Sequence, residues 1–379
     1  AGLAFLIVTF GPAVDPNRRQ DVDDAKNLPV EEFLLDRLDR GAELIYLDFY
    51  HLSEEAFQDV WQTVLYNHPE LFYVSSSYKY AATNLKILHL EPEYTMDEEA
   101  RSVAKKNYSL ALETILQDVD PQWSDLETAL YLHDWVALNC AYDETLDHYS
   151  AYDLFTLGTG VCQAYALAYQ ALLEECGIPC QYVASKTMNH AWTEICLDGT
   201  WYHVDPTYDD PVFDRRGHVQ HTFFLKSDAT FQETHTDADA PYPCDSDAYD
   251  DALWNDVTSA FIPVNGTFYC ISGNQICRWD ETGFTPLLTI SDLWYVINEP
   301  YAYWDGCFSA LATDGTNLLY NTPKEIRRYE PDTGRTQTLY TYDESWHIYG
   351  FTYRDGLLTC QVAPDPNSPG ESIKISLTE

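Results

Sequence analysis

The spacing of hydrophobic residues divides the chain into a helix-rich part and a strand-rich part. In the first part, apolar residues recur at helical spacing, and Ser53 and Ser124 stand where helix N-caps are expected. Helices are predicted over residues 28–40, 52–69, 97–118 and 124–140. Strand segments are predicted over 43–51 and, as a hairpin, over 71–94. The apolar opening AGLAFLIVTF, residues 1–10, is interpreted as a buried strand.

In the last third of the chain, short segments rich in tyrosine and tryptophan alternate with turn pairs. The segment NGTFYCISGNQICRWDETG, which starts at Asn265, resembles DGTNLLYNTPKEIRRYEPDTG, which starts at Asp314, and a weaker copy starts at Asp355. A spacing of about fifty residues, with Arg278 recurring as Arg328, is typical of propeller blades. A closed propeller needs about four blades, and this region holds about three. We therefore expect blade-like hairpins that do not close into a ring.

Three domains follow from these patterns. A small mixed α/β unit is expected at residues 1–95, an α+β domain at 96–244 and an all-β domain at 245–379. The stretch THTDADAPYPCDSDAYDDA, which starts at Thr234, is rich in proline and aspartate and is interpreted as the linker before the third domain.

Composition restricts the partners of the protein. The 379-residue chain has a formal net charge of −40, so nucleic acid phosphates and anionic lipid headgroups repel it. No stretch approaches the ~18 to 20 apolar residues that cross a bilayer, and no basic segment precedes the apolar opening, as one would in a signal peptide. We therefore expect neither a nucleic acid partner nor membrane insertion. The ten cysteines include no CxxC pair, which argues against a zinc site.

One cysteine stands where a reactive thiol is expected. The segment CQAYALAYQALLEEC is apolar on nearly every side, which predicts a buried helix that stops at Gly177. Cys162 opens this helix, where free N–H groups and the positive end of the helix dipole favour a thiolate. Considered alone, Cys162 is more simply interpreted as an ordinary buried cysteine.

The residues downstream change that interpretation. The pair Asp198-Gly199 lies between alternating segments and predicts a tight hairpin. Its register makes His190 and Asp205 diagonal neighbours on one sheet face, with backbones ~7 to 8 Å apart. Considered singly, each has a structural interpretation, His190 as a satisfied histidine and Asp205 as a turn residue at the end of a strand. Together with Cys162 they are the three parts of an activated thiol nucleophile.

A second histidine of the hairpin is interpreted differently. His203 shares the face of Asp205 but lies opposite Glu194, so it is predicted to be a supporting or surface residue.

Three blocks of the sequence resemble the transglutaminase-like superfamily, in particular its bacterial thiol peptidase branch. The blocks are GTGVCQAYALAYQALLEECGIPC, MNHAWTEICLDGTWYHVDPTYDDP and HTFFLKSDATFQETH. The resemblance implies a papain-like α+β core in which the cysteine helix packs on an antiparallel sheet. It also implies that Cys162 is the nucleophile, His190 the general base and acid, and Asp205 the orienting carboxylate.

The sequence departs from the family pattern at three positions. Ala164 stands where a glycine is common after the nucleophile, and Tyr208 where a tryptophan is common after the aspartate. Val161 precedes the nucleophile where animal cross-linking enzymes carry glutamine, which weakens a cross-linking interpretation.

The expected function is that of a cysteine peptidase or amidase that attacks a protein or cell-wall peptide through a thioester. Protein-glutamine γ-glutamyltransferase activity, which is cross-linking, and a non-catalytic scaffold with the same fold are the alternatives. Acidity and the resemblance favour an extracellular or cell-surface location. We expect no cofactor and no metal, and the C-terminal β domain is predicted to bind a protein or a cell-surface partner.

Four further residues are candidates for the site. The backbone N–H of Cys162 is the first expected donor to the oxyanion, and Gln163 or Tyr142 is the candidate for the second. Trp192 and Tyr208 are candidates for lining the cleft, with core packing as the alternative for each.

Overall fold

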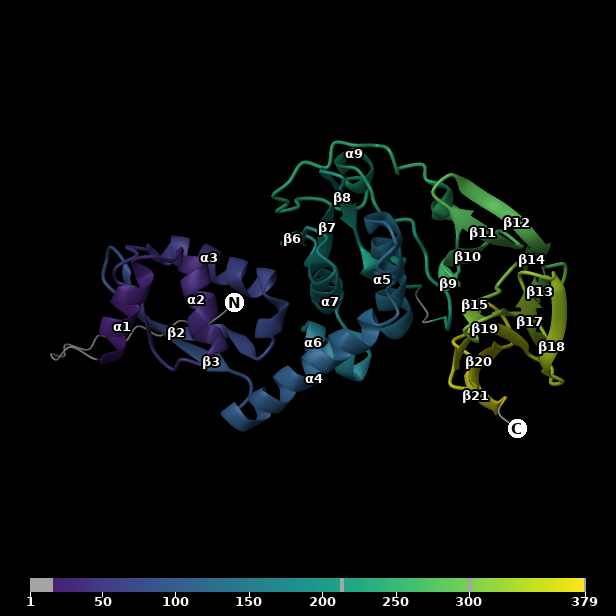
Figure 1. Cartoon of the computed structure of the whole chain (residues 1–379), viewed down its shortest axis with the longest axis horizontal. Coiled ribbons are helices and arrows are strands. Elements are labelled where there is room, and N and C mark those ends of the chain that lie inside the picture. Colours follow the sequence, from purple (N-terminus) through teal and green to yellow (C-terminus); the bar gives the residue numbers. More distant parts are fainter. Residues whose placement is uncertain (1–15, 212–214, 299–301, 378–379) are drawn as a thin grey trace. The chain divides into compact units, whose positions relative to one another are not determined.

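A computed structural model describes residues 16–211, 215–298 and 302–377 (Figure 1). The strand predicted over residues 1–10 lies outside these ranges. The chain forms two compact units: residues 1–116 with 150–157, and residues 117–149 with 158–379. The domain boundaries predicted after residues 95 and 244 stay predictions.

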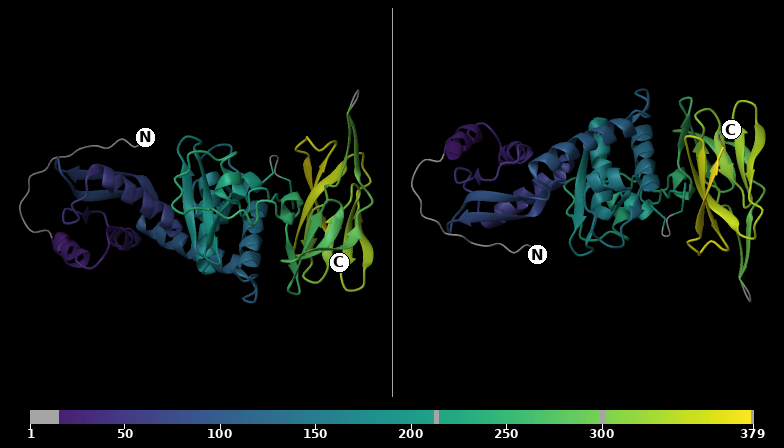
Figure 2. Two further views of the ribbon diagram at one scale, coloured as in Figure 1. Left: turned by 90° about the horizontal axis from the view of Figure 1, so that it is seen from above. Right: turned by 90° about the horizontal axis from the view of Figure 1, so that it is seen from below.

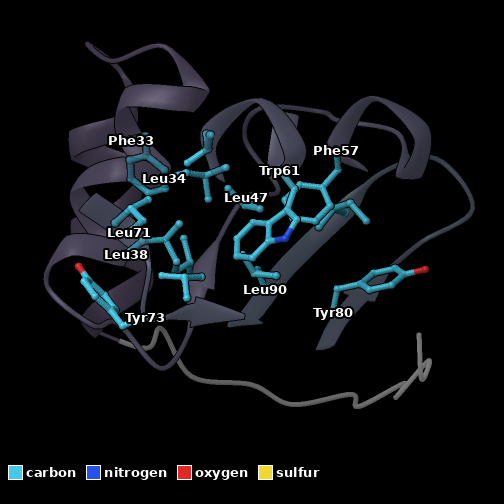
Figure 3. Close-up of a cluster of buried hydrophobic side chains, with 14 residues drawn as sticks. Phe33, Leu34, Leu38, Leu47, Phe57, Trp61, Leu71, Tyr73, Tyr80 and Leu90 are labelled. Carbon is cyan, nitrogen blue, oxygen red and sulfur yellow. The ribbon is translucent and has the colours of Figure 1, made fainter. Parts of the chain in front are cut away.

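The first unit is a small sheet covered by helices around one hydrophobic core (Figure 3). Its elements are α1 (Pro16–Ala25), α2 (Val30–Asp39), β1 (Ile45–Tyr46), α3 (Glu54–Asn67), a 3-10 turn (Pro69–Leu71), β2 (Val74–Ala82), β3 (Ile87–Tyr94), α4 (Glu98–Leu116) and α6 (Ala151–Leu157). The strands lie in the order β1-β3-β2. Phe33, Trp61 and Leu90 are buried at the centre of this core.

Most predicted elements of this unit are confirmed. Ser53 caps α3 by accepting the N–H of Ala56, and the predicted hairpin is β2 and β3. The strand predicted over 43–51 is largely wrong, because only β1 pairs there and the next residues form a turn.

The second unit begins with two helices packed together on a three-stranded sheet. Its helices α5 (Asp125–Asn139) and α7 (Cys162–Glu175) are in contact, and α7 packs on β6 (Cys180–Ser185) and β7 (His190–Leu197). Strand β8 (Thr200–Val204) completes the order β6-β7-β8. Ser124 and Glu127 form a full capping box that starts α5. Two further strands, β4 (Ala141–Tyr142) and β5 (Thr159–Gly160), pair in parallel before α7.

The register of the β7–β8 hairpin is the predicted one. Leu197 pairs with Thr200, and Glu194 pairs with His203. Asp198 and Gly199 both have positive φ values, 49° and 82°, as a type I′ turn requires. Because side chains alternate strictly between sheet faces, this turn decides which residues accompany His190.

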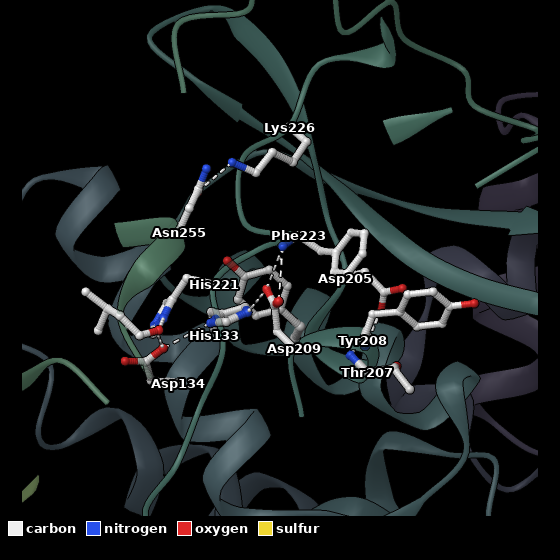
Figure 4. Close-up of polar contacts among 12 residues, drawn as sticks. His133, Asp134, Asp205, Thr207, Tyr208, Asp209, His221, Phe223, Lys226 and Asn255 are labelled. Atoms are coloured by element: carbon white, nitrogen blue, oxygen red, sulfur yellow. Dashed lines mark hydrogen bonds and ion pairs between the residues drawn. The ribbon is translucent and has the colours of Figure 1, made fainter. Parts of the chain in front are cut away.

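Four buried residues, which we call the buried histidine cluster, fasten α5 to the segments that carry Asp209 and His221 (Figure 4). They are His133, Asp134, Asp209 and His221. The ring of His133 lies between the two carboxylates, 3.0 Å from Asp134 and 3.1 Å from Asp209, and His221 contacts Asp134 at 2.8 Å. Asp134 also accepts the N–H of Phe261, so the cluster ties α5 to the start of the strand-rich region.

The rest of the second unit is a series of antiparallel meanders (Figure 2). Two sheets have four strands each. One contains β9 (Ile262–Val264), β10 (Thr267–Ser272), β11 (Gln275–Asp280) and β12 (Gly283–Thr289), and the other β15 (Leu311–Thr313), β16 (Leu318–Asn321), β17 (Glu325–Glu330) and β18 (Arg335–Thr341). The remaining sheets pair β13 (Trp294–Asn298) with β14 (Ala302–Gly306), and β19 (His347–Arg354) with β20 (Leu357–Ala363) and β21 (Glu371–Ser376).

The two four-stranded sheets repeat each other in detail. Arg278 lies in β11 and Arg328 at the matching position of β17, and each strand has an irregularity after the corresponding isoleucine, Ile276 or Ile326. The predicted hairpins at Asn265, Asp314 and Asp355 are therefore confirmed, whereas an incompletely closed ring stays a prediction.

The segment interpreted as a free linker is partly packed. Cys244 is fully buried, and its N–H donates to Asp228 at 3.0 Å. Asp250 accepts hydrogen bonds from the backbone and the hydroxyl of Ser227. Proline and aspartate content correctly indicated irregular backbone, but it did not reveal that this backbone is anchored.

Candidate active site

Cys162 is the first residue of α7, as predicted, and its thiol is free. It is half-buried, so the thiol is not sealed in the core. The N–H groups of the first helical turn, which include those of Cys162 and Gln163, have no partner within the helix. The approach to this turn is tight, because a Cβ on Gly160 would lie 2.5 Å from the Cβ of Ala164. Ala164 thus fills the space beside Gly160.

His190 and Asp205 meet in the structure. Nε2 of His190 lies 2.6 Å from Oδ2 of Asp205. Because Nε2 faces the carboxylate, Nδ1 is the ring nitrogen left for another partner, and Cys162 lies near enough to His190 to raise its pKa. The side chains of His190 and Asp205 are 8% and 0% exposed, so water competes little with their contact.

The position of Asp205 differs from the predicted one in one respect. It was expected on a strand, but β8 ends at Val204 and Asp205 is the N-cap of the short helix α8 (Pro206–Asp209). Its Oδ1 accepts the N–H groups of Thr207 and Tyr208, at 2.9 and 3.2 Å. The same carboxylate therefore starts a helix with one oxygen and holds His190 with the other.

Electrostatics favour a charged histidine at this position. Burial opposes the imidazolium, but hydrogen bonds with Asp205 and Cys162 outweigh it and raise the pKa of His190 to about 10. Burial would also raise the pKa of Asp205, but hydrogen bonds from His190 and His235 lower it to about 2. Near neutral pH the histidine therefore holds two protons and the aspartate none.

Sequence reasoning missed His235. Its Nε2 lies 2.9 Å from Oδ2 of Asp205, and the two histidines therefore share one carboxylate oxygen. We call Asp205, His190 and His235 the Asp205 cluster. Residue 235 lies 30 positions after Asp205, beyond a four-residue helix, α9 (Asp228–Phe231), and no local spacing connects the two. Only the block HTFFLKSDATFQETH, which ends on this histidine, hinted at it.

The other candidate residues fall into two groups. Tyr142 and Tyr208 are 47% and 41% exposed, and the ring of Tyr208 lies 4.7 Å from that of His190. Gln163 is half-buried beside the thiol. Trp192 does not line a cleft, because it is fully buried and donates its indole N–H to His203. The core-packing alternative for Trp192 is the correct one.

His203 is a buried support and not a surface residue. Its Nδ1 accepts from Trp192 at 3.1 Å, and its Nε2 lies 2.9 Å from Asp228. Its distance to Glu194, its partner across the hairpin, is 3.7 Å. The predicted pairing is thus right, but the stronger contacts of His203 lie elsewhere.

Three groups of side chains within the described residues have a composition that could hold a metal ion. They are His133 with Asp134 and His221, His190 with Asp205 and His235, and Glu194 with His203 and Cys244. In the first two, direct hydrogen bonds already join the histidines to the carboxylate. In the third, the indole of Trp192 occupies the Nδ1 lone pair of His203. Hydrogen bonding therefore accounts for these contacts.

Comparison with known proteins identifies the region that carries the site. Residues 113–206, which contain Cys162, His190 and Asp205, match the family described as the Transglutaminase-like superfamily. This segment is therefore similar to that superfamily. No curated protein matches the chain.

Solved structures give partial matches to this chain. One is described as a "Putative Cysteine Protease from Cytophaga hutchinsonii", with 25% identity over 29% of this chain and 40% of that chain, and a TM-score of 0.23. Another is described as "a TGase", with 11% identity over 52% of this chain and 49% of that chain, and a TM-score of 0.25. The chain thus spans less than half the length of either protein.

Proposed function

We propose that the protein is a cysteine-dependent amide hydrolase that cleaves protein or peptide substrates through a thioester. The observation that carries this proposal is the 2.6 Å contact between His190 and Asp205, with Cys162 close enough to the same histidine to raise its pKa. A sulfur, a base that takes its proton and a carboxylate that orients the base are what nucleophilic attack on an amide needs.

At the start of the reaction His190 already carries the proton that Cys162 has given up, and the sulfur acts as a thiolate beside the imidazolium. The thiolate then forms a bond to the carbonyl carbon, and the carbonyl oxygen takes up negative charge. The N–H groups of Cys162 and Gln163 lie at the start of α7 and donate hydrogen bonds to this oxygen. The positive end of the helix dipole stabilises its charge further. As the tetrahedral intermediate collapses, His190 gives its proton to the leaving amine. Water, deprotonated by His190, then attacks the thioester and releases the acid.

The surroundings of the thiol fit a peptide substrate. Tyr142 and Tyr208 are both near Cys162 and both substantially exposed. Burial and then neighbouring acidic groups, Cys162 among them, raise the pKa of both phenols, so they stay neutral at physiological pH. Neutral aromatic side chains of this kind supply apolar contact and a hydroxyl for a peptide backbone.

The location and the partners of the protein belong to the same proposal. In the described ranges, every helix is too short or too polar to cross a bilayer. The net charge of −40 disfavours nucleic acid and anionic lipid, and we infer an extracellular protein or peptide substrate. The antiparallel meanders from β9 onward are the proposed surface for a protein or cell-surface partner.

The test follows the fate of the acyl group. Casein is incubated with the protein in the presence of a fluorescent primary amine, and with Cys162→Ala as the control. We expect new peptides by mass spectrometry and no amine attached to casein. Amine incorporation would establish cross-linking instead. Val161, which is buried, disfavours this outcome, because animal cross-linking enzymes carry glutamine at that position. The absence of both products, with an unreactive thiol, would leave the scaffold alternative.

A further inference from the structure

His235 contacts the carboxylate of Asp205, which orients the proposed base His190. It was not among the site residues predicted from the sequence, because it lies 30 residues after Asp205. It lies 2.9 Å from the oxygen that His190 contacts at 2.6 Å, and the side chains of Asp205 and His235 are both 0% exposed. We propose that His235 is a positioning residue that fixes Asp205 and, through it, the ring of His190. This inference rests on the proposed function of Cys162.

The direction of the hydrogen bond follows from the charge of Asp205. The carboxylate is ionised near neutral pH, so it can only accept. Nε2 of His235 must therefore carry a hydrogen and donate it. The hydroxyl of Thr234 lies 2.8 Å from Nδ1 of the same ring and satisfies the other nitrogen. Both ring nitrogens thus have partners, and the ring is fixed in orientation.

With His235 in place, Asp205 has no freedom to turn. Oδ1 accepts two backbone N–H groups, from Thr207 and Tyr208, and Oδ2 accepts two imidazole N–H groups. Without His235, His190 is the only remaining partner of Oδ2. A buried carboxylate oxygen that loses a donor is poorly compensated, because no water reaches it. The two N–H groups still hold Oδ1, but Oδ2 is held less firmly, and so is the ring of His190 that contacts it.

The backbone around His235 is itself anchored to the strands that carry His190. The N–H of His235 donates to the carbonyl of Phe231 at 2.8 Å, and the two rings stack at 3.8 Å. One residue later, the carbonyl of Thr236 accepts from the hydroxyl of Ser185 at 2.6 Å. Ser185 is the cross-strand partner of His190 in β6 and β7. His235 is therefore held from both sides, by α9 and by the sheet.

The test uses alkylation of Cys162 by iodoacetamide as a function of pH, followed by mass spectrometry. The titratable groups that face His190 are Asp205, His235, Cys162 and Tyr208, and only His235 is changed. We expect His235→Ala to move the profile upward by about one pH unit. This is about a 10-fold slower reaction at pH 7, because a less firmly held His190 stabilises the thiolate less well.

The matched variants separate positioning from packing. His235→Gln places an amide N–H where Nε2 stood, and we expect it to restore the rate to within about 3-fold of wild type. His218→Gln is the control, because His218 is also buried and its ring nitrogens contact the carbonyls of Thr258 and Tyr349, neither of which belongs to the Asp205 cluster. Its profile should match that of the wild type. If His235→Ala fails to fold, His235→Asn replaces it, because its shorter amide ends before Asp205.

Each outcome decides between the inference and the function on which it rests. A His235→Ala profile identical to wild type would overturn the inference and leave the proposed function standing. A folded His235→Gln variant as slow as His235→Ala would also overturn it, because the N–H would not be what matters. If wild-type Cys162 reacts only at the pH of an ordinary thiol, the proposed function fails, whatever His235 does.

Discussion

The buried histidine cluster and the Asp205 cluster have the same chemistry and different surroundings. Each places histidine rings against buried carboxylates at 2.6 to 3.1 Å. In the buried histidine cluster, both nitrogens of His133 face carboxylates, so neither is left for a nucleophile. In the Asp205 cluster, one nitrogen of His190 remains for the thiol of Cys162.

The difference shows why a histidine–aspartate contact alone does not mark an active site. In the buried histidine cluster the contacts close on themselves and join α5, α8 and the segment after Phe261. In the Asp205 cluster they end at a half-buried cysteine on the first turn of a helix. We infer that the first cluster serves stability and the second serves chemistry. The following experiments test this distinction.

The largest expected effect is on turnover. Cys162→Ala and His190→Ala should each lower the rate of peptide cleavage by about 10⁴-fold or more, because the nucleophile and its base act as a unit. The melting temperature of Cys162→Ala should stay close to wild type, since Cys162 is half-buried and bonded to no other cysteine. Initial rates on casein, with circular dichroism as the folding control, measure both quantities. Retained cleavage in Cys162→Ala would contradict the proposed mechanism.

The opposite pattern is expected in the buried histidine cluster. Asp134→Ala leaves His133 and His221 without their shared partner and frees the N–H of Phe261. Removal of one partner from a buried ion pair costs about 3–5 kcal/mol in the free energy of unfolding. Urea unfolding measures this loss. Where the variant remains folded, Cys162 should still react with iodoacetamide at the wild-type rate. Slow alkylation in a folded variant would show that the two clusters are coupled.

The pH dependence of stability should reflect His133. Burial opposes its charge, but hydrogen bonds with Asp134 and Asp209 outweigh it and raise its pKa from 6.5 to about 9. A raised pKa means that its contribution to stability is complete below about pH 6.5 and is lost as the pH rises through about 9. Unfolding free energies at several pH values should therefore fall over this interval. In His133→Phe the unfolding free energy should change less with pH over this interval. An unchanged dependence would mean that other groups cause it.

The smallest effect is expected at the rim of the site. Tyr208→Ala should raise KM by about 3- to 10-fold with little change in melting temperature, because the side chain is 41% exposed and contacts the ring of His190. Trp192→Phe is the counterpart from the core. It should cost about 1 kcal/mol of stability through the lost bond to His203, with KM unchanged. If KM rose in Trp192→Phe and not in Tyr208→Ala, Trp192 would contact the substrate and Tyr208 would not.

Local sequence signals predicted much of this architecture. Ser53 and Ser124 marked two helix starts, Asp198-Gly199 fixed the register of β7 and β8, and the spacing from Arg278 to Arg328 revealed two matching sheets. These signals work because caps, tight turns and repeats depend on neighbouring residues. The contact of His190 with Asp205 was predictable for the same reason, since a two-residue turn joins the strand of His190 to the strand that Asp205 directly follows.

The sequence by itself determined a helix that opens on Cys162 and a hairpin that brings His190 to Asp205. Only the tertiary structure decided that His235 contacts the same carboxylate, that Trp192 is buried, and that His133 and His221 lie against shared aspartates. These contacts join segments that are distant in sequence. They depend on how helices and loops pack over the sheet, which hydrophobic burial decides without leaving a spacing that can be read along the chain.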